Sequence, residues 1–481
     1  MTDDSPAPVD GVLLITVDSL RADAVGGQHS NSPTIDSLAE SGARFENAFA
    51  TGNWTPFSFP SILGRHPVFA EGPDIGVSSA PTLAETFQEY GVNTAGFNAA
   101  NGFLTSHWGY DRGYDSFETF TESDDSFYGR YLAAHPTVQG WMQLLTSPFR
   151  RVIGRLRGDD RPQFLDASRL IDVETRAKEF IESTDDSFFL WVHYMDTHTP
   201  YVPAPRHLRT VTDQRTSTLR MLRAHLRTGF GLDVGEETLA DLQALYDATV
   251  HQVDASIGRL LDTLEAAGVR DQTTVVVAGD HGEEFMDHGH LAHYPKLYDE
   301  LAHVPLVVDH PEGPAKTISD PISLDVLPPT LLESAGVPEQ ETFDGDSALD
   351  VLLDDSNDVE EGVESSTIPV TVAVRGDSVT QQPIPKRLDD GNLLVSARSA
   401  DWTYIHHTGT EAHELYHRRT DPTERTDVWP ERRDEAGVDR LREAALDHVE
   451  RLQEGADSPS QPDAGDTPDG VQQRLEALGY Q

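Results

Sequence analysis

Three side chains able to bind a metal follow directly after apolar stretches of the chain. Asp18 ends the apolar run of LLITVDSLRAD, and Asp280 and His281 end that of VVVAGDHGEEF. Short continuous apolar runs are typical of strands buried on both faces of a parallel sheet. Ligands of open α/β sheets gather outside the carboxyl ends of such strands, so these residues are candidates for a divalent-metal site. The alternative is that both aspartates merely cap the helices that follow them.

A threonine stands at the start of a short predicted helix in the segment NWTPFSFPSILG. Pro56 at the first helical position places Thr55 at the helix N-terminus, where the helix dipole favours an anion. A hydroxyl bound to a metal there would lose its proton more easily and become a nucleophile. On local sequence alone, an ordinary threonine cap is the simpler interpretation.

These motifs belong to a longer series that resembles the sulfatase family of the alkaline-phosphatase-like superfamily. The resemblance runs from about Gly11 to Asp350, and ELYHRRTDPTE extends it towards the C-terminus. It predicts an α/β fold with a doubly wound, mainly parallel sheet and a small C-terminal α+β subdomain. The segments that carry it are GVLLITVDSLRAD, SPTIDSLAESGARFENAFA, NWTPFSFPSILG, FFLWVHYMDTHTPY, AGDHGEEF, LYDELAHVPLVV and SLDVLPPTLLESAGVP.

The resemblance assigns roles to individual residues. Asp18, Asp280 and His281 match metal ligands of the family. Thr55 falls where the family has its nucleophile, which also binds the metal.

Further residues match positions around the reacting group. His198 matches a histidine that contacts the transferred group or protonates the leaving group, and Lys296 stands where the family often has a substrate-binding lysine. His293 is a further candidate substrate contact. Asn98 stands where relatives place a lysine or histidine, and either Asn98 or Asn101 donates a neutral hydrogen bond there or only shapes a loop.

The chain departs from typical sulfatases at its proposed nucleophile and metal site. It has no cysteine, and a threonine cannot be converted to formylglycine because its β-carbon bears a methyl group. Ser19 replaces a metal-binding aspartate, and His281 replaces the usual asparagine. These changes resemble the threonine-nucleophile branches that act on phosphate esters, and they favour manganese or zinc over calcium.

We therefore predict a one-metal hydrolase of small anionic sulfate or phosphate esters. Two alternatives remain open from the sequence. One is a transferase that passes a phosphorylated head group to a glycan or lipid acceptor through the same threonine. The other is a non-catalytic relative that keeps the fold as a binding module.

The charge of the chain restricts its partners and its surroundings. There are 82 acidic and 36 basic residues, a formal net charge of −46, which argues against binding nucleic acid or anionic membranes. Arginine supplies nearly all the basic residues, a pattern that indicates a halophile of haloarchaeal type, whose near-molar salt screens the carboxylates. No apolar run is long enough to span a membrane, and the N-terminus lacks a signal-peptide pattern, so we expect a cytoplasmic protein.

The elements that must position these residues alternate between strands and helices, as in a doubly wound sheet. The predicted domains are a catalytic domain at 11–354, an acidic loop or linker at 355–392, a C-terminal subdomain at 393–453, and a tether with a last short helix at 454–481. Residues 122–161 are predicted to be an insertion. Strands are predicted at 12–17, 188–194, 274–278, 304–308, 393–395 and 402–405, and helices at 34–41, 82–90, 236–267 and 434–452.

Overall fold

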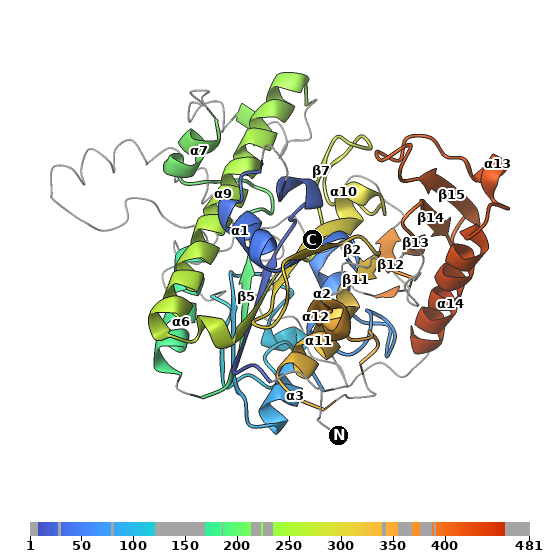
Figure 1. Ribbon diagram of the computed structural model, residues 1–481. Helices are drawn as coiled ribbons and strands as arrows, with labels where there is room; N and C mark the ends of the chain where they lie inside the picture. The colour runs from blue at the N-terminus through green and yellow to red at the C-terminus, as the bar shows by residue number, and fades with distance from the viewer. Residues whose placement is uncertain are drawn as a thin grey trace.

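Figure 1 shows the computed structural model of the chain. The structure describes residues 8–26, 30–77, 81–120, 169–184, 186–212, 223–224, 234–338, 343–354, 368–375, 387–388 and 391–456. The predicted insertion at 122–161 lies outside the described residues, as does nearly all of the predicted tether and last helix at 454–481.

A large sheet forms the centre of the fold. Among the described residues it has nine strands in the order β10-β2-β9-β6-β1-β5-β3-β4, with β11 paired to β2. The strands from β6 to β4 are parallel, and β9 is antiparallel to both of its neighbours. Their bounds are β1 Gly11–Val17, β2 Ala43–Phe49, β3 Asn93–Asn98, β4 Ser116–Glu118, β5 Phe188–Tyr194, β6 Thr273–Gly279, β9 His303–Asp309, β10 Lys316–Ile318 and β11 Ile322–Ser323.

Helices cover both faces of this sheet (Figure 1). Alternate residues of β1 enter two separate cores because successive side chains of a strand point to opposite faces. Leu13 and Ile15 pack in the core that includes α9, whereas Val12 and Leu14 pack in the core that includes α2. The first face is covered by α1 Pro33–Ser41, α6 Leu170–Ser183, α7 Pro205–Val211 and α9 Glu236–Ala267, and the second by α2 Thr55–Leu63, α3 Leu83–Glu89, α11 Leu327–Ser334 and α12 Leu349–Leu353.

The C-terminal part of the chain forms a second, antiparallel sheet of order β12-β13-β14-β15, with α14 packed against it. The predicted α/β class, with a mainly parallel sheet and a small C-terminal subdomain, is confirmed. One boundary differs, because β12 lies inside the span 355–392 that was expected to be a loop or linker. The bounds are β12 Val370–Arg375, β13 Asn392–Arg398, β14 Trp402–His407, β15 Ala412–His417, α13 Trp429–Arg432 and α14 Val438–Ala456.

β12 also joins the two parts of the molecule. It runs parallel to the segment that precedes α2: Val372 N donates to Thr51 O at 2.9 Å, and Asn53 N donates to Val372 O at 3.2 Å. A short hairpin, β7 Glu284–Phe285 and β8 Leu291–Ala292, and the helix α10 Asp299–Ala302 lie between β6 and β9 in the chain.

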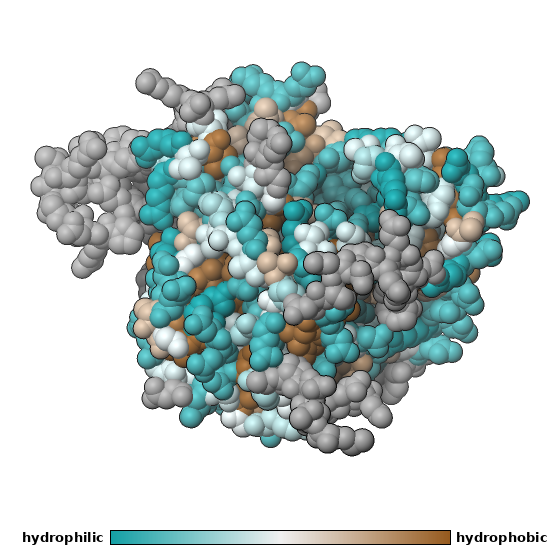
Figure 2. Space-filling view, in the orientation of Figure 1, coloured by the Kyte–Doolittle hydropathy of each residue, from teal (hydrophilic) through white to brown (hydrophobic). Residues whose placement is uncertain are grey.

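The face of the molecule in Figure 2 is mainly hydrophilic, with apolar side chains in small separate patches. Among the described residues, no helix is long and apolar enough to cross a membrane.

Candidate functional site

The carboxyl ends of β1 and β6 bring the first site residues together. The two strands are parallel neighbours in which Val17 pairs with Gly279, so the next residues, Asp18 and Asp280, lie side by side. Both aspartates are fully buried. The strand-end arrangement expected from the sequence therefore exists in the fold.

Thr55, the first residue of α2, completes the cluster. Its Oγ1 donates to Asp280 Oδ2 at 2.9 Å, and it lies 3.3 Å from Asp18 Oδ2 and 3.4 Å from His281 Nε2. His281 Nε2 also lies 3.5 Å from Asp18 Oδ1. All four residues predicted to hold a metal thus meet at one point.

Backbone contacts fix the orientation of two of these side chains. Asp280 Oδ1 accepts hydrogen bonds from the backbone N–H groups of His281 and Ser19, at 2.8 and 3.1 Å, which leaves Oδ2 facing Thr55. His281 Nδ1 contacts Gly282 O at 2.8 Å, so Nδ1 carries a hydrogen and Nε2 is the nitrogen that faces the carboxylates. Nε2 is therefore the nitrogen of His281 that could ligate a metal.

A second histidine, His193, enters the cluster from β5. One ligand atom each from Asp18, His193 and Asp280 lies within 4.8 Å of the others. His193 Nδ1 contacts Thr16 Oγ1 at 2.9 Å, whereas Nε2 is buried without a hydrogen-bond partner and lies 3.8 Å from Asp18 Oδ2. A buried polar nitrogen ordinarily has a hydrogen-bond partner, so an unpaired nitrogen beside a carboxylate fits the role of a metal ligand.

The electrostatics also fit a bound cation. Burial, together with the charge of Asp18, raises the pKa of Asp280 to about 6. Burial opposes ionisation of Asp18 as well, but the imidazoles of His198, His193 and His281 hold its pKa well below the usual range. Ligand oxygens of Asp18 and Asp280 lie within 4.8 Å of each other, so the two ionised carboxylates would repel each other. A divalent cation would offset that repulsion. The residues that would hold it offer oxygen and nitrogen atoms, a set that suits a divalent metal.

Two further predicted residues line the same region. His198 and His293 are buried, their ring centroids lie 5.0 Å apart, and the His293 centroid also lies 5.0 Å from that of His281. His198 Nδ1 contacts the carbonyl of Thr199 at 2.6 Å, which turns Nε2 away from that carbonyl. Burial lowers the pKa of His198, and it lowers that of His293 to about 3.

The structure distinguishes between the two asparagines considered from the sequence. Asn98 Nδ2 donates to the carbonyls of Asn101 and Leu104, at 3.1 and 2.9 Å, and so shapes the loop after β3. Asn101 Nδ2 donates to Asp18 Oδ2 at 3.0 Å. The amide that reaches the metal cluster therefore belongs to Asn101, and Asn98 holds the loop that carries it.

Lys296 contacts a different group of residues from those around Asp18. Its Nζ lies 3.3 Å from a carboxylate oxygen of Glu284, donates to His288 O, and stands 5.8 Å from the ring centroid of Tyr294. Among the described residues its polar contacts are with this group and not with Asp18. Burial lowers its pKa, against the opposing effect of Glu284.

Two groups near the cluster lacked a signal in the sequence. His193 sits inside a strand, so a search of strand ends passes over it, although its register opposite Thr16 places it beside Asp18. Glu283 lies two residues after the predicted ligand His281, between β6 and β7, where an acidic residue is ordinarily exposed. In the fold it has no exposed surface, and burial raises its pKa to about 7 against the opposing effect of His198.

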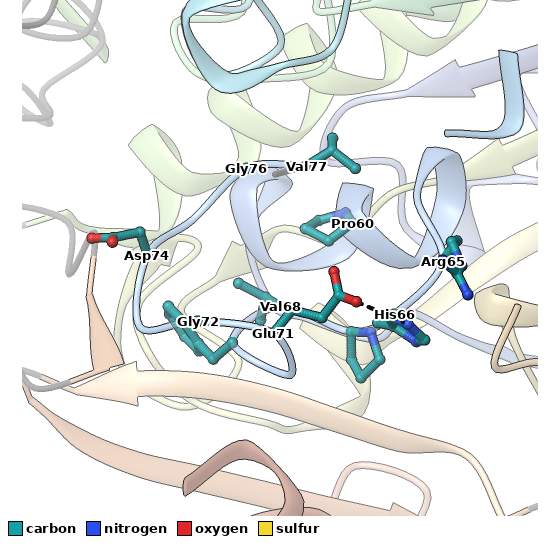
Figure 3. A pocket seen from close by; sticks show the side chains of 11 residues that line it. Pro60, Arg65, His66, Val68, Glu71, Gly72, Asp74, Gly76 and Val77 are labelled. Carbon is teal, nitrogen blue, oxygen red and sulfur yellow. Dashed lines mark ion pairs between the residues drawn. The ribbon is translucent and has the colours of Figure 1, made fainter. Parts of the chain in front are cut away.

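A small pocket lies past the opposite end of α2, at residues 65–77 (Figure 3). Its wall includes His66, whose Nε2 lies 3.3 Å from Glu71. The cavity holds about 30 Å³, about the space of one water molecule. Thr55 begins α2 and the pocket follows its last turn, so this pocket is separate from the metal cluster.

Comparison with known proteins identifies the family of the chain. The profile of the sulfatase family matches residues 11–337, about two thirds of the chain. The chain belongs to the sulfatase family.

Several known proteins align with most of the length of this chain. An uncharacterized sulfatase, YidJ, of Escherichia coli (strain K12) is 24% identical over 92% of this chain and 87% of its own. A choline-sulfatase of Rhizobium meliloti (strain 1021) is 24% identical over 87% of this chain and 82% of its own. The crystal structure of a phosphonate monoester hydrolase of Agrobacterium radiobacter superposes with a TM-score of 0.64 at 18% identity, covering 94% of this chain and 96% of that one.

Proposed function

We propose that this chain is a metal-dependent hydrolase of sulfate or phosphate esters, phosphonates included, in which Thr55 is the nucleophile. The observation that carries the proposal is the position of Thr55 Oγ1, within 3.4 Å of two carboxylates and an imidazole at the start of a helix. A capping threonine would bond to the backbone of its own helix, whereas the contacts of Thr55 Oγ1 are with the side chains of Asp18, Asp280 and His281.

The residues of the cluster can each serve one step. A bound divalent cation would neutralise the oxygens of the transferred group and favour loss of the Thr55 proton. Asp280 Oδ2 already accepts that hydrogen at 2.9 Å. Thr55 Oγ1 then bonds to the sulfur or phosphorus while the bond to the alcohol oxygen breaks, and His198 gives a proton to the departing oxygen. Water subsequently cleaves the ester formed on Thr55, which regenerates the hydroxyl.

The choice between sulfate and phosphate rests on Thr55 and on the ligands. A threonine cannot supply the hydrated aldehyde of formylglycine-dependent sulfatases, and an imidazole replaces an oxygen ligand at His281. The relatives include both a choline-sulfatase and, by structure, a phosphonate monoester hydrolase. We favour phosphate and phosphonate esters, with manganese or zinc as the metal.

Substitution of Thr55 tests the proposal. Thr55→Ala should lower kcat by several orders of magnitude on the best substrate of a panel of sulfate, phosphate and phosphonate esters, because the two-step path disappears. Thr55→Ser should keep part of the rate, since a primary hydroxyl can still attack. Mass spectrometry should detect the transferred group on the peptide that contains Thr55.

Thr86→Ala is a matched control. Thr86 is also a buried helical threonine, but its hydroxyl donates to Thr82 O within α3. Its loss should leave kcat within a few-fold of the unchanged protein. A Thr55→Ala protein with near-normal turnover would refute the covalent path, and an equal loss in Thr86→Ala would assign the effect to folding.

A further inference from the structure

Glu283 is a buried carboxylate whose side-chain polar contacts, among the described residues, are with Tyr201 and His293. Tyr201 donates its hydroxyl to Oε1, and His293 Nδ1 lies 3.4 Å from Oε2. Among the described residues, no lysine or arginine side chain forms an ion pair with it. A carboxylate buried without a cationic partner costs free energy, so stability of the fold does not explain its presence.

The groups around this contact are held rigidly by the backbone. Arg21 Nη1 donates to Glu283 O at 2.8 Å, and Glu283 N donates to Glu300 O at 3.0 Å. Trp54 Nε1 donates to His293 O at 2.6 Å. The carboxylate and the imidazole therefore approach each other from two anchored segments of chain.

We infer that Glu283 and Tyr201 are positioning residues for His293, which they hold as a substrate contact of the proposed hydrolase. The contact of Glu283 Oε2 with His293 Nδ1 sets the orientation of the imidazole ring. The ring then lies beside those of His281 and His198, whose centroids each lie 5.0 Å from that of His293. Of the residues Glu283, Tyr201 and His293, the substrate contact is His293, and the other two act through it. This inference rests on the proposed function.

A double variant separates positioning from folding. Glu283→Leu combined with Tyr201→Phe removes the carboxylate and the hydroxyl together, so neither is left as an orphan. Because apolar replacement of buried charge is often neutral or stabilising, Tm should stay unchanged or rise. kcat/KM should nevertheless fall about 10- to 100-fold, as for other groups that orient a functional histidine.

The variant His293→Ala completes the comparison. If Glu283 acts through His293, the triple variant should lose no more kcat/KM than His293→Ala alone, because the energies of coupled residues do not add. Additive losses would overturn the inference. Tyr194→Phe is the matched control, since Tyr194 is an equally buried tyrosine whose hydroxyl contacts Ser256 at 3.0 Å on the α9 side of the sheet. Its kcat/KM should stay within about threefold of that of the unchanged protein.

Nitrogen NMR provides a measurement that requires no turnover. In protein labelled with ¹⁵N-histidine, the ring signals of His293 are assigned by their absence from His293→Ala. They should shift or broaden in the Glu283→Leu/Tyr201→Phe protein and stay in place in Tyr194→Phe. Unchanged His293 signals would refute the inference even in an active enzyme. A shift in a protein that cleaves no ester would support the positioning and count against the proposed hydrolase instead.

Discussion

Asp280 and Asp254 are both buried aspartates, and they show two uses of the same side chain. Asp254 Oδ1 accepts the backbone N–H groups of Thr34 and Ile35, both at 2.9 Å, and so caps α1 from α9. Asp280 also accepts two backbone N–H groups with one oxygen, but its other oxygen meets Thr55. At Asp280 the oxygen that accepts backbone hydrogen bonds and the oxygen that faces Thr55 are different, so the backbone contacts leave the second oxygen available to a metal.

This contrast gives a test of the metal site. Asp280→Ala should remove most of the manganese or zinc bound by the purified protein, measured by elemental analysis. Tm of the unchanged protein should rise with added metal, because a ligand that binds only the folded state stabilises it. That rise should vanish in Asp280→Ala and persist in Asp254→Ala. Full metal content in Asp280→Ala would count decisively against the assignment.

At the scale of single residues, the sequence predicts a site residue when a reactive side chain stands at the end of a strand or the start of a helix. Asp18, Asp280 and Thr55 could be predicted because apolar runs and a proline mark strand and helix ends. His193 could not, and the choice between Asn98 and Asn101 stayed open, since these places depend on strand register and on the fold of a loop. Lys296 was predicted from the motif order alone; its Nζ lies 3.3 Å from Glu284, and its role as a substrate contact stays a prediction.

At the scale of elements, β12 is a strand that the prediction missed. Its sequence VTVAVR has alternating valines, a strand pattern, but it follows an acidic stretch that is typical of a loop. These residues form a strand because two partners are available: β13, and the segment 51–53 that leads to Thr55. β1, β5, β6, β9 and α9 were predicted because each has a sustained apolar pattern of its own, whereas the pairing of β12 with the segment 51–53 could not be derived from the sequence.

Gly52 lies where this pairing approaches Thr55, the proposed nucleophile. A Cβ at this position would lie 2.3 Å from Phe57 Cβ and 2.7 Å from its carbonyl carbon, so the loop before Thr55 would have to move. Gly52→Ala should cost about 1–3 kcal/mol of unfolding free energy, as overpacking does, and should lower kcat at least tenfold. Denaturant melts and kinetics test this, with Gly72→Ala as control, because a Cβ there meets nothing within 4 Å. Unchanged kcat in Gly52→Ala would show that the loop does not set the position of Thr55.

The contact between the C-terminal subdomain and the main sheet should also depend on pH. Glu424 is buried there and accepts the backbone N–H of Asp299 at 2.8 Å; burial and the charge of Asp299 raise its pKa to about 8. The folded protein therefore keeps a proton on Glu424 that the unfolded chain releases above its ordinary value of 4.5. Stability from this group is complete below about pH 4.5 and is lost as pH rises towards 8, by at most about 1.4 kcal/mol per pH unit. Glu424→Gln should flatten this fall in urea melts; an unchanged slope would exclude Glu424 as its source.

At the scale of the whole molecule, charge is the dominant feature. A formal net charge of −46 on 481 residues produces self-repulsion that disfavours the compact state. Ion pairs such as Arg176 with Glu118 and Arg259 with Glu174 relieve this only locally, because 36 basic residues face 82 acidic ones. Apolar packing on both faces of the sheet must therefore hold the fold against a repulsion that acts over the entire surface.

The salt concentration should determine the distance over which the carboxylates repel one another. The Debye length is about 10 Å at 0.1 M and about 3 Å at 1 M, so molar salt confines each carboxylate's field to its nearest neighbours. We predict that Tm rises steeply from 0.1 to about 2 M KCl and that dilution into low salt unfolds the chain. Sucrose at matched osmolarity is the control, because it favours compact states without screening charge, and it should raise Tm much less. If Tm is flat across the KCl series, or rises equally in sucrose, the acidic composition is not an adaptation to salt, and the apolar cores alone outweigh the repulsion.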